Sequence, residues 1–307
     1  MHLRLATRAS ALALFQANAV ADALMASVPG LTVALVPTET SGDQRTDVTI
    51  AALGGQGVFI KEVQQLVLSG VADLAVHSAK DLPSLPTPGL TIAAFTERGD
   101  VRDCLVGRSL AGLGPGATVA CGAPRRRAVL AQLRPDLHLV ELRGNIATRI
   151  ARADERGVDA VVVAVVALER LGLMGKVAEI LDPLVMVPQV GQGAFAVECR
   201  ADDLDTVELL AGIDHAPTRE ALTAERTYLS TLGGGCSVPV GAWARRESDE
   251  LRLDALLAAP DGTTVLRTSR SGAAADDLGV EVARELRDDA GGAVLMDRWG
   301  TRPATGV

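Results

Sequence analysis

The first hundred residues alternate between two patterns of apolar and polar positions. Short apolar runs typical of strands lie at residues 3–6, 32–36, 74–77 and 90–94. Apolar residues with helical spacing lie at residues 11–25 and 59–68, and Ser10 is placed to cap the first of these helices. Strands that alternate with helices in this way predict an α/β domain.

A second α/β pattern follows the polar segment 96–100. Its strands are expected at residues 118–121, 138–142 and 160–166, and its helices are expected to begin near Arg125 and Asn145. The run 160–166 is wholly apolar, which is typical of a parallel strand covered on both faces. These segments predict a second α/β domain.

The pattern changes again after residue 187. The turn-rich segment 188–193 leads into a strand at 194–199, which is too short to found a domain and is expected to return to the first sheet. A helix, three strands and a further helix follow, at residues 216–232, 241–245, 251–258, 263–269 and 275–288. We therefore predict two α/β domains, of residues 1–96 with 194–211 and of residues 102–187, and a C-terminal α+β domain of residues 216–307.

The composition narrows the classes of function. The 307 residues carry a net charge of −8 and 2% of them are aromatic, which argues against a nucleic-acid surface, because such a surface needs a basic stripe or stacking platforms. No run approaches the ~20 apolar residues that span a membrane, and the first residues do not have the pattern of a signal peptide, so we expect a cytoplasmic protein. The four cysteines form no CxxC pair, so we expect reduced thiols and neither a metal site nor a disulfide.

One cysteine stands in an unusual setting. Cys236 follows three consecutive glycines at 233–235 and is soon followed by Pro239. Glycine loses much backbone entropy in a helix or strand and proline lacks an amide donor, so this stretch is expected to be an exposed loop. A thiol on such a loop, facing a cationic cleft, would suit a polyanionic ligand that is bound covalently.

Arginines recur where predicted strands end and helices begin. Residues 125–127 are all arginine, at a helix start whose free amides and dipole favour anions, and Arg143 and Arg149 flank the next helix start. The chain has no GxxxxGK[ST] loop and no GxGxxG after a strand, so carboxylates are favoured over nucleotide phosphates as the ligand. Taken singly, each arginine is better explained by a solvated helix face or a surface ion pair, and only the recurrence of arginines at such positions favours a ligand.

Lys80 and Asp81 follow the buried strand 74–77, at the strand end where an α/β fold commonly carries functional side chains. At about 4 Å and an effective dielectric constant of about 20, an aspartate stabilises a cation by about 4 kcal/mol, or about a thousandfold in rate if the cation forms only in the transition state. The alternative is that Lys80 and Asp81 cap a helix or neutralise each other. His77 is interpreted as a core histidine rather than a catalyst.

Taken together, these motifs resemble the porphobilinogen deaminase (hydroxymethylbilane synthase) family from one end of the chain nearly to the other. The matching segments are residues 6–10, 57–62, 72–81, 142–145, 190–194 and 234–236. The resemblance implies two periplasmic-binding-protein-like α/β domains around a cleft, with a small C-terminal α+β domain. It implies a transferase of tetrapyrrole (heme) biosynthesis that condenses four porphobilinogen molecules onto a dipyrromethane primer, releases ammonia, and then releases hydroxymethylbilane by hydrolysis. A cytoplasmic monomer that binds neither nucleic acid nor membrane is expected.

The resemblance also implies a role for each candidate residue. Asp81 matches the catalytic aspartate of the family, and Cys236 matches the residue that carries the dipyrromethane cofactor through a thioether. The residues expected to bind this cofactor are Ser10, Lys80, Gly122, Arg125, Arg126 and Arg143. Those expected to contact the substrate are Arg8, Phe59, Arg149, Arg170 and Gln192. No metal is expected.

The segment before the arginine pair departs from the family pattern. Family members usually have threonine and serine where this chain has Cys121, Gly122 and Ala123, and Gln56 stands where a lysine is common. Losing two or three hydrogen bonds to charged groups, at ~1.5 to 3 kcal/mol each, would weaken the binding of carboxylates. This departure keeps open a divergent paralogue with impaired elongation. A non-catalytic, two-lobed anion-binding protein is a second alternative, because paired α/β lobes around an anion cleft also serve solute capture.

Overall fold

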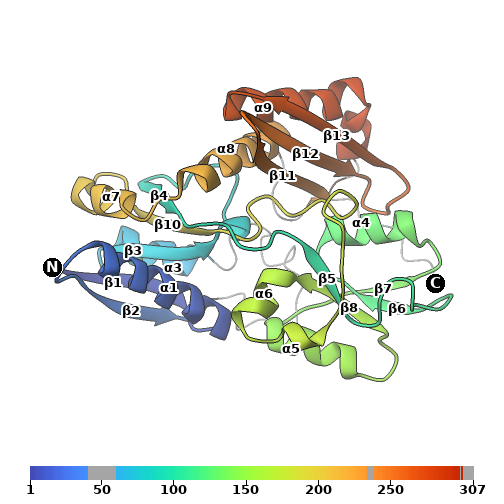
Figure 1. The fold of residues 1–307 in the computed structure, drawn as a ribbon, viewed down its shortest axis with the longest axis horizontal. Coiled ribbons are helices and arrows are strands. Elements are labelled where there is room, and N and C mark those ends of the chain that lie inside the picture. The colour runs from blue at the N-terminus through green and yellow to red at the C-terminus, as the bar shows by residue number, and fades with distance from the viewer. Residues whose placement is uncertain (41–59, 234–237, 298, 300–307) are drawn as a thin grey trace. The chain divides into compact units, whose positions relative to one another are not determined.

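The computed structural model describes residues 1–40, 60–233, 238–297 and 299 (Figure 1). Contacts between residues divide the chain into two compact units, which are residues 1–99 with 191–220 (unit 1) and residues 100–190 with 221–307 (unit 2). The predicted C-terminal domain falls largely within unit 2 and is not separated from the second α/β domain by these contacts. The boundaries of the three predicted domains therefore stay a prediction.

Unit 1 is built on a five-stranded sheet in the order β2-β1-β3-β10-β4. Its strands are β1 (His2–Arg8), β2 (Thr32–Thr38), β3 (Leu74–Ser78), β4 (Leu90–Phe95) and β10 (Phe195–Arg200). β1 pairs in parallel with β2 and β3, whereas β10 runs antiparallel between β3 and β4. The prediction that the strand near residue 194 returns to the first sheet is confirmed.

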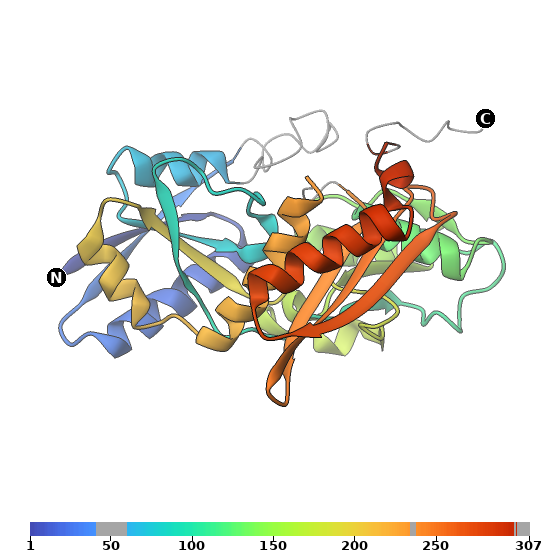
Figure 2. The same ribbon diagram turned by 90° about the horizontal axis from the view of Figure 1, so that it is seen from above.

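Helices cover both faces of this sheet. The helical elements are α1 (Ala11–Ser27), α3 (Lys61–Leu68), the 3-10 turn η1 (Ala79–Asp81) and α7 (Leu204–Ala211). α1 shares a core with Leu5 and Leu74, while α3 packs with Ala6 and Ala75 on the opposite face (Figure 2). The cores alternate in this way because successive residues of a strand point to opposite sides of the sheet.

Unit 2 begins with a second five-stranded sheet, in the order β7-β6-β8-β5-β9. Its strands are β5 (Asp103–Gly107), β6 (Thr118–Ala120), β7 (His138–Val140), β8 (Ala160–Ala164) and β9 (Val177–Ile180). β6 pairs in parallel with β7 and β8, and β5 runs antiparallel to β8 and β9. The helical elements are α4 (Pro124–Leu133), α5 (Ile146–Ala151), η2 (Arg152–Asp154), α6 (Val165–Arg170) and η3 (Met174–Lys176).

The last part of the chain forms a three-stranded antiparallel sheet covered by helices. Its elements are α8 (Ala216–Thr231), β11 (Val240–Glu247), β12 (Glu250–Ala258), β13 (Val265–Gly272), α9 (Ala275–Arg284), the π-helical turn η4 (Glu285–Asp289) and α10 (Gly292–Met296). α9 lies over this sheet in Figure 2 and contacts β12 and β13, and Val282 shares a core with Tyr228 of α8. α4 packs on the same strands, because Ala128 and Val129 share a second core with Leu256 of β12.

The two α/β sheets and the C-terminal α+β part confirm the predicted fold class, with one strand placed wrongly. The run 160–166 is not a single strand, since β8 ends at Ala164 and α6 begins at Val165. Both segments are buried, and an apolar run without periodicity does not distinguish a buried strand from the first turn of a buried helix. β8 is also only partly parallel, because β5 pairs with it in the antiparallel direction.

Candidate active site

The sheet of unit 1 brings five of the predicted site residues to one edge. β1 and β3 are parallel, so the segments after both strands lie at the same edge, and antiparallel β10 begins there because Phe195 pairs with Ser78. The residues placed at this edge are Arg8, Ser10, Lys80, Asp81 and Gln192. Ligands of open α/β sheets bind at such edges.

The turn that carries Lys80 and Asp81 is held by the segment 191–193. Gly191 has a φ of +74°, and a Cβ atom there would lie 2.9 Å from the carbonyl carbon of Ala79 and 3.0 Å from the amide nitrogen of Lys80. The side chain of Gln192 is buried, and its Oε1 accepts a hydrogen bond of 3.0 Å from Lys80 Nζ. Gln192 therefore contacts Lys80, and its predicted contact with substrate stays a prediction.

Ser10 and His77 have structural roles beside this turn. Ser10 is the N-cap of α1, where its hydroxyl oxygen accepts a hydrogen bond of 3.4 Å from the amide of Ala13. The cap predicted for Ser10 is confirmed, while its contact with a cofactor is untested. His77 is buried, with Nε2 lying 3.1 Å from Glu198 Oε2, which agrees with its interpretation as a core histidine.

The sheet of unit 2 brings the predicted arginines to one edge in the same manner. β6, β7 and β8 run in parallel, so the segments that follow them lie at a common edge. Gly122, Arg125 and Arg126 follow β6, Arg143 and Arg149 follow β7, and Arg170 ends the helix after β8. The carboxyl edges of both sheets thus carry residues of the predicted site.

Arg125 and Arg126 are buried, with 1% and 5% of their surface exposed, and both face Asp103. Arg125 Nη2 donates to Asp103 Oδ2 and Arg126 Nη2 donates to Asp103 Oδ1, each at 2.7 Å. Burial has the largest influence on the pKa of each guanidinium and lowers that pKa, whereas the carboxylate of Asp103 raises it. The net result is a lowered pKa for Arg125 and a raised pKa for Arg126. Sequence reasoning missed Asp103, whose only signal is that a charged residue directly precedes the apolar run 104–106.

The other three arginines are half-buried. Arg143 Nε lies 2.9 Å from the exposed carboxylate of Glu141, and Arg149 Nε donates a hydrogen bond of 2.8 Å to the carbonyl of Gly144. Burial removes much of the hydration of the Arg170 guanidinium and so lowers its pKa to about 10. A partly dehydrated guanidinium gains from a carboxylate partner more than a fully hydrated one does.

Gly122, in the segment before α4 that departs from the family pattern, stands where there is no room for a side chain. A Cβ atom on Gly122 would lie 2.4 Å from the carbonyl oxygen of Leu142, so glycine permits a close approach between the segments that follow β6 and β7. Ala123 is the N-cap of α4 and provides no side-chain hydrogen bond to the helix start. The backbone amides of the first turn are therefore left to other acceptors.

Two predicted site residues lie outside the described residues. These are Cys236, the predicted point of cofactor attachment, and Phe59, the predicted aromatic contact of the substrate. Gln56 lies outside them as well.

Two family models together match most of the chain. The model described as porphobilinogen deaminase, dipyromethane cofactor binding domain, matches residues 3–208, and the model of the porphobilinogen deaminase C-terminal domain matches residues 220–288. The chain belongs to the porphobilinogen deaminase family. The resemblance read from the sequence is confirmed, and with it the transferase class and the dipyrromethane cofactor of this family.

Curated members of the porphobilinogen deaminase family match over nearly their full length. Porphobilinogen deaminase of Roseiflexus sp. (strain RS-1) is 48% identical over 298 residues, which are 95% of this chain and 98% of that protein. Porphobilinogen deaminase of Roseiflexus castenholzii is 47% identical over the same shares of both chains. Among solved structures, the periplasmic VFT2 domain of Bordetella pertussis BvgS matches over 74% of this chain and 92% of that one. The TM-score of 0.43 and the sequence identity of 16% are too low to bear on function.

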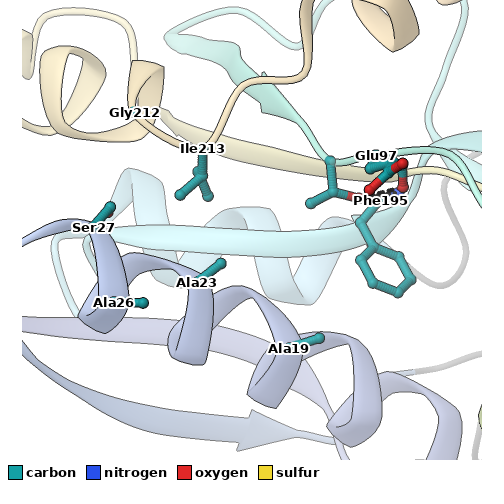
Figure 3. A pocket seen from close by; sticks show the side chains of 9 residues that line it. Ala19, Ala23, Ala26, Ser27, Glu97, Phe195, Gly212 and Ile213 are labelled. Atoms are coloured by element: carbon teal, nitrogen blue, oxygen red, sulfur yellow. Dashed lines mark hydrogen bonds between the residues drawn. The ribbon is translucent and has the colours of Figure 1, made fainter.

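A shallow depression in unit 1 does not fit the carboxylate-rich ligands of a porphobilinogen deaminase. Small side chains along α1, including Ala19 and Ala23, line it opposite Ile213, beside Phe195 and Glu97 (Figure 3). None of the predicted site residues lines this depression, and no arginine does. In the described ranges, no group of three or more histidine, cysteine, aspartate or glutamate residues could hold a metal ion, and no helix is long and apolar enough to cross a membrane.

Proposed function

We propose that this protein is a hydroxymethylbilane synthase that uses the two sheet edges for different tasks. The edge of unit 1 supplies Asp81 for the chemistry, and the edge of unit 2 supplies arginines for the carboxylates of the substrate and product. The observation that carries this proposal is the match of both family models together with the gathering of the predicted residues at these edges.

The reaction requires a carbocation to be stabilised at the aminomethyl carbon of porphobilinogen. The carbon–nitrogen bond breaks and its electron pair leaves with ammonia, which makes this carbon electron-deficient. A bound pyrrole chain would supply the free α-carbon that bonds to it and then loses its proton. Asp81 is the carboxylate at the edge of unit 1 that we assign to this cation and to the pyrrole N–H groups. Its charge at about 4 Å contributes about 4 kcal/mol at an effective dielectric constant of about 20, or about a thousandfold in rate.

Lys80 and Gln192 orient this carboxylate without taking part in the bond changes. Gly191 fixes the backbone of Ala79 and Lys80, and the hydrogen bond from Lys80 Nζ to Gln192 Oε1 ties the same turn to the 191–193 segment. A carboxylate on a turn that is held at its backbone by Gly191 and at the Lys80 side chain by Gln192 needs little reorganisation when the cation forms. Arg8 and Ser10, at the same edge, are assigned to substrate and cofactor carboxylates.

The residues of unit 2 fit a group that bears several carboxylates. Two guanidinium groups share the single carboxylate of Asp103, and three further guanidinium groups, those of Arg143, Arg149 and Arg170, follow β7 and β8 at the same edge. When bound, the dipyrromethane supplies the anchored α-carbon from which the chain is extended. Gly122, Arg125, Arg126 and Arg143 are assigned to its carboxylates, and Arg149 and Arg170 to those of the substrate, because charge-assisted arginine–carboxylate pairs are strong and directional.

The assignments outside the described residues rest on the family pattern. We assign Cys236 to the thioether bond with the cofactor, as an anchor that persists through every addition, and Phe59 to stacking against the reacting ring. We also propose a monomer in the cytoplasm. Cys104, Cys121 and Cys199 are free thiols in the part of the chain that the structure describes, which suits a reducing compartment.

A second candidate function is that of a paralogue with impaired elongation. The close approach of Gly122 to Leu142 leaves no room for the serine side chain that is usual in the family, and so the corresponding hydroxyl donor is absent. Such a protein would carry the cofactor and bind porphobilinogen, yet elongate the pyrrole chain slowly.

Intact mass and turnover measured on the same preparation test the proposal. We expect the purified protein to exceed its sequence mass by two linked pyrroles, the Cys236→Ser variant to lack this increment, and Cys199→Ala, a change at a buried cysteine, to keep it. The wild-type protein should convert porphobilinogen to hydroxymethylbilane with release of ammonia. An unmodified chain after expression with ample porphobilinogen would contradict the proposal, whereas a full increment with slow turnover would support the paralogue.

A further inference from the structure

Asp103 lies where the two buried arginines meet. It is the first residue of β5 and has 0% of its surface exposed. β5 runs antiparallel to β8 with Asp103 opposite Ala164, so this acid lies at the carboxyl edge of β6 and β8, where α4 begins. The antiparallel direction of β5 is therefore what brings a carboxylate to the arginine edge.

Each oxygen of Asp103 binds a different arginine. Arg125 Nη2 donates to Oδ2 and Arg126 Nη2 to Oδ1, both at 2.7 Å. The other terminal nitrogens donate to backbone carbonyls, from Arg125 to Val187 at 2.6 Å and from Arg126 to Val162 at 3.1 Å. Every terminal nitrogen of the pair is thus directed by a fixed acceptor.

The pair nevertheless retains hydrogen-bonding capacity and charge. The Nε atoms of Arg125 and Arg126 are buried and have no hydrogen-bond partner within the described ranges. Two guanidinium groups against one carboxylate also leave one positive charge in a buried setting, which is costly unless an anion accompanies it. Both observations indicate a site that is completed by an anionic ligand group.

We propose that Asp103 is a positioning residue for the Arg125–Arg126 pair, holding the two guanidinium groups in the orientation that binds a carboxylate of the dipyrromethane cofactor. This inference rests on the proposed function. Asp103 acts through the arginines and does not contact the reacting atoms. The single negative charge of Asp103 reduces the repulsion between the two guanidinium groups. It also leaves the pair with a net positive charge, which attracts a carboxylate of the ligand.

Asp103→Asn and Asp103→Glu test the inference, with Asp159→Asn as a matched control. Asp159 is a carboxylate of the same unit that accepts a hydrogen bond of 2.9 Å from the amide of Thr118, but it precedes β8 and so lies at the opposite edge of the sheet. If a carboxylate at either position had a purely structural role, its replacement would lower the thermal midpoint and leave cofactor attachment and KM unchanged. Each variant is measured for cofactor attachment by intact mass, for KM and kcat with porphobilinogen, and for its thermal midpoint.

We expect Asp103→Asn to carry the cofactor on less than about half of the chains and to raise KM by about tenfold, since a misplacement of binding groups by about 1 Å costs up to about 10²-fold. Asp103→Glu keeps the charge and is expected to restore attachment while KM stays a few-fold raised. Asp159→Asn should lower the thermal midpoint with attachment and KM unchanged.

Full attachment and a KM within twofold of wild type in folded Asp103→Asn would overturn the inference. If Asp103→Asn does not fold, Asp103→Glu decides, because a wild-type KM in that variant shows that the orientation of the pair is immaterial. The wild-type protein is measured alongside. A wild type without cofactor and turnover overturns the proposed function and this inference with it, whereas a competent wild type with a competent Asp103→Asn overturns only the inference.

Discussion

Replacing Gly191 by alanine is expected to displace the turn that carries the proposed catalytic carboxylate. The added Cβ atom would lie 2.9 Å from the carbonyl carbon of Ala79 and 3.0 Å from the amide nitrogen of Lys80, whereas ordinary contacts of a Cβ atom begin at 3.4 Å. Both partners are backbone atoms and cannot rotate away. The two segments must therefore move apart by roughly half an ångström.

Two costs follow from this substitution. The first is the φ of +74°, which a residue with a Cβ atom adopts at a cost of about 1 to 2 kcal/mol. The second is the displacement of Lys80 and Asp81. Since a misplacement of about 1 Å can cost 10²-fold in rate, half that distance is expected to lower kcat by about tenfold.

Gly70→Ala separates the two costs. Gly70 belongs to the same unit and has a φ of +73°, but nothing lies within 4 Å of a Cβ atom placed there. Urea unfolding and steady-state kinetics with porphobilinogen are measured for both variants. Both should lose about 1 to 2 kcal/mol from the backbone strain, and only Gly191→Ala should lose about tenfold in kcat. Equal kcat values in the two variants would refute the argument that Gly191 positions Asp81.

Two further predictions concern the site, and a third concerns a buried thiol of the core. Asp81→Asn should lower kcat by about a thousandfold with little change in the unfolding midpoint, and a near-normal rate would remove its assigned role. Gly122→Ser should raise KM, because its Cβ atom would lie 2.4 Å from the carbonyl oxygen of Leu142, and a lower KM would contradict this steric argument. Ala123→Ser should instead raise the free energy of unfolding by about 1 kcal/mol, because serine at the N-cap of α4 accepts a hydrogen bond from the helix start. Burial raises the pKa of the Cys199 thiol to about 11, so alkylation followed by peptide mass mapping should leave it unmodified at pH 8 in the folded protein and modify it in urea. Because this pKa is higher in the folded state, the thiol's contribution to stability is fully present below the unfolded value of about 9 and should be lost as the pH rises toward 11.

The sequence pattern was sufficient for elements with strong periodicity or clear punctuation. The strand near residue 74 and the helix after Ser10 appear within a few residues of their predicted bounds. β5 and β9 were not predicted, because they have five and four residues and lack a hairpin signal. The boundary between β8 and α6 at Val165 was also hidden, since buried strands and buried helices are equally apolar.

The candidate site was predictable in its parts but not in its connections. A helix start after a strand predicted where Arg125 and Arg126 lie, and the end of a buried strand predicted the turn at Asp81. Their partners come from elsewhere in the chain. Asp103 lies 22 residues before Arg125, and Gln192 lies 112 residues after Lys80, so only the pairing of strands brings them together.

The interior place of β10 has a consequence for how the chain is made. β10 lies between β3 and β4, yet it follows β4 by about a hundred residues of sequence. A nascent chain that has emerged only to residue 190 lacks this strand, and so the edges of β3 and β4 remain open to pairing with other chains. The amino-terminal portion therefore completes its sheet only after residue 200 has emerged from the ribosome, and protection of that portion from protease should begin at that chain length.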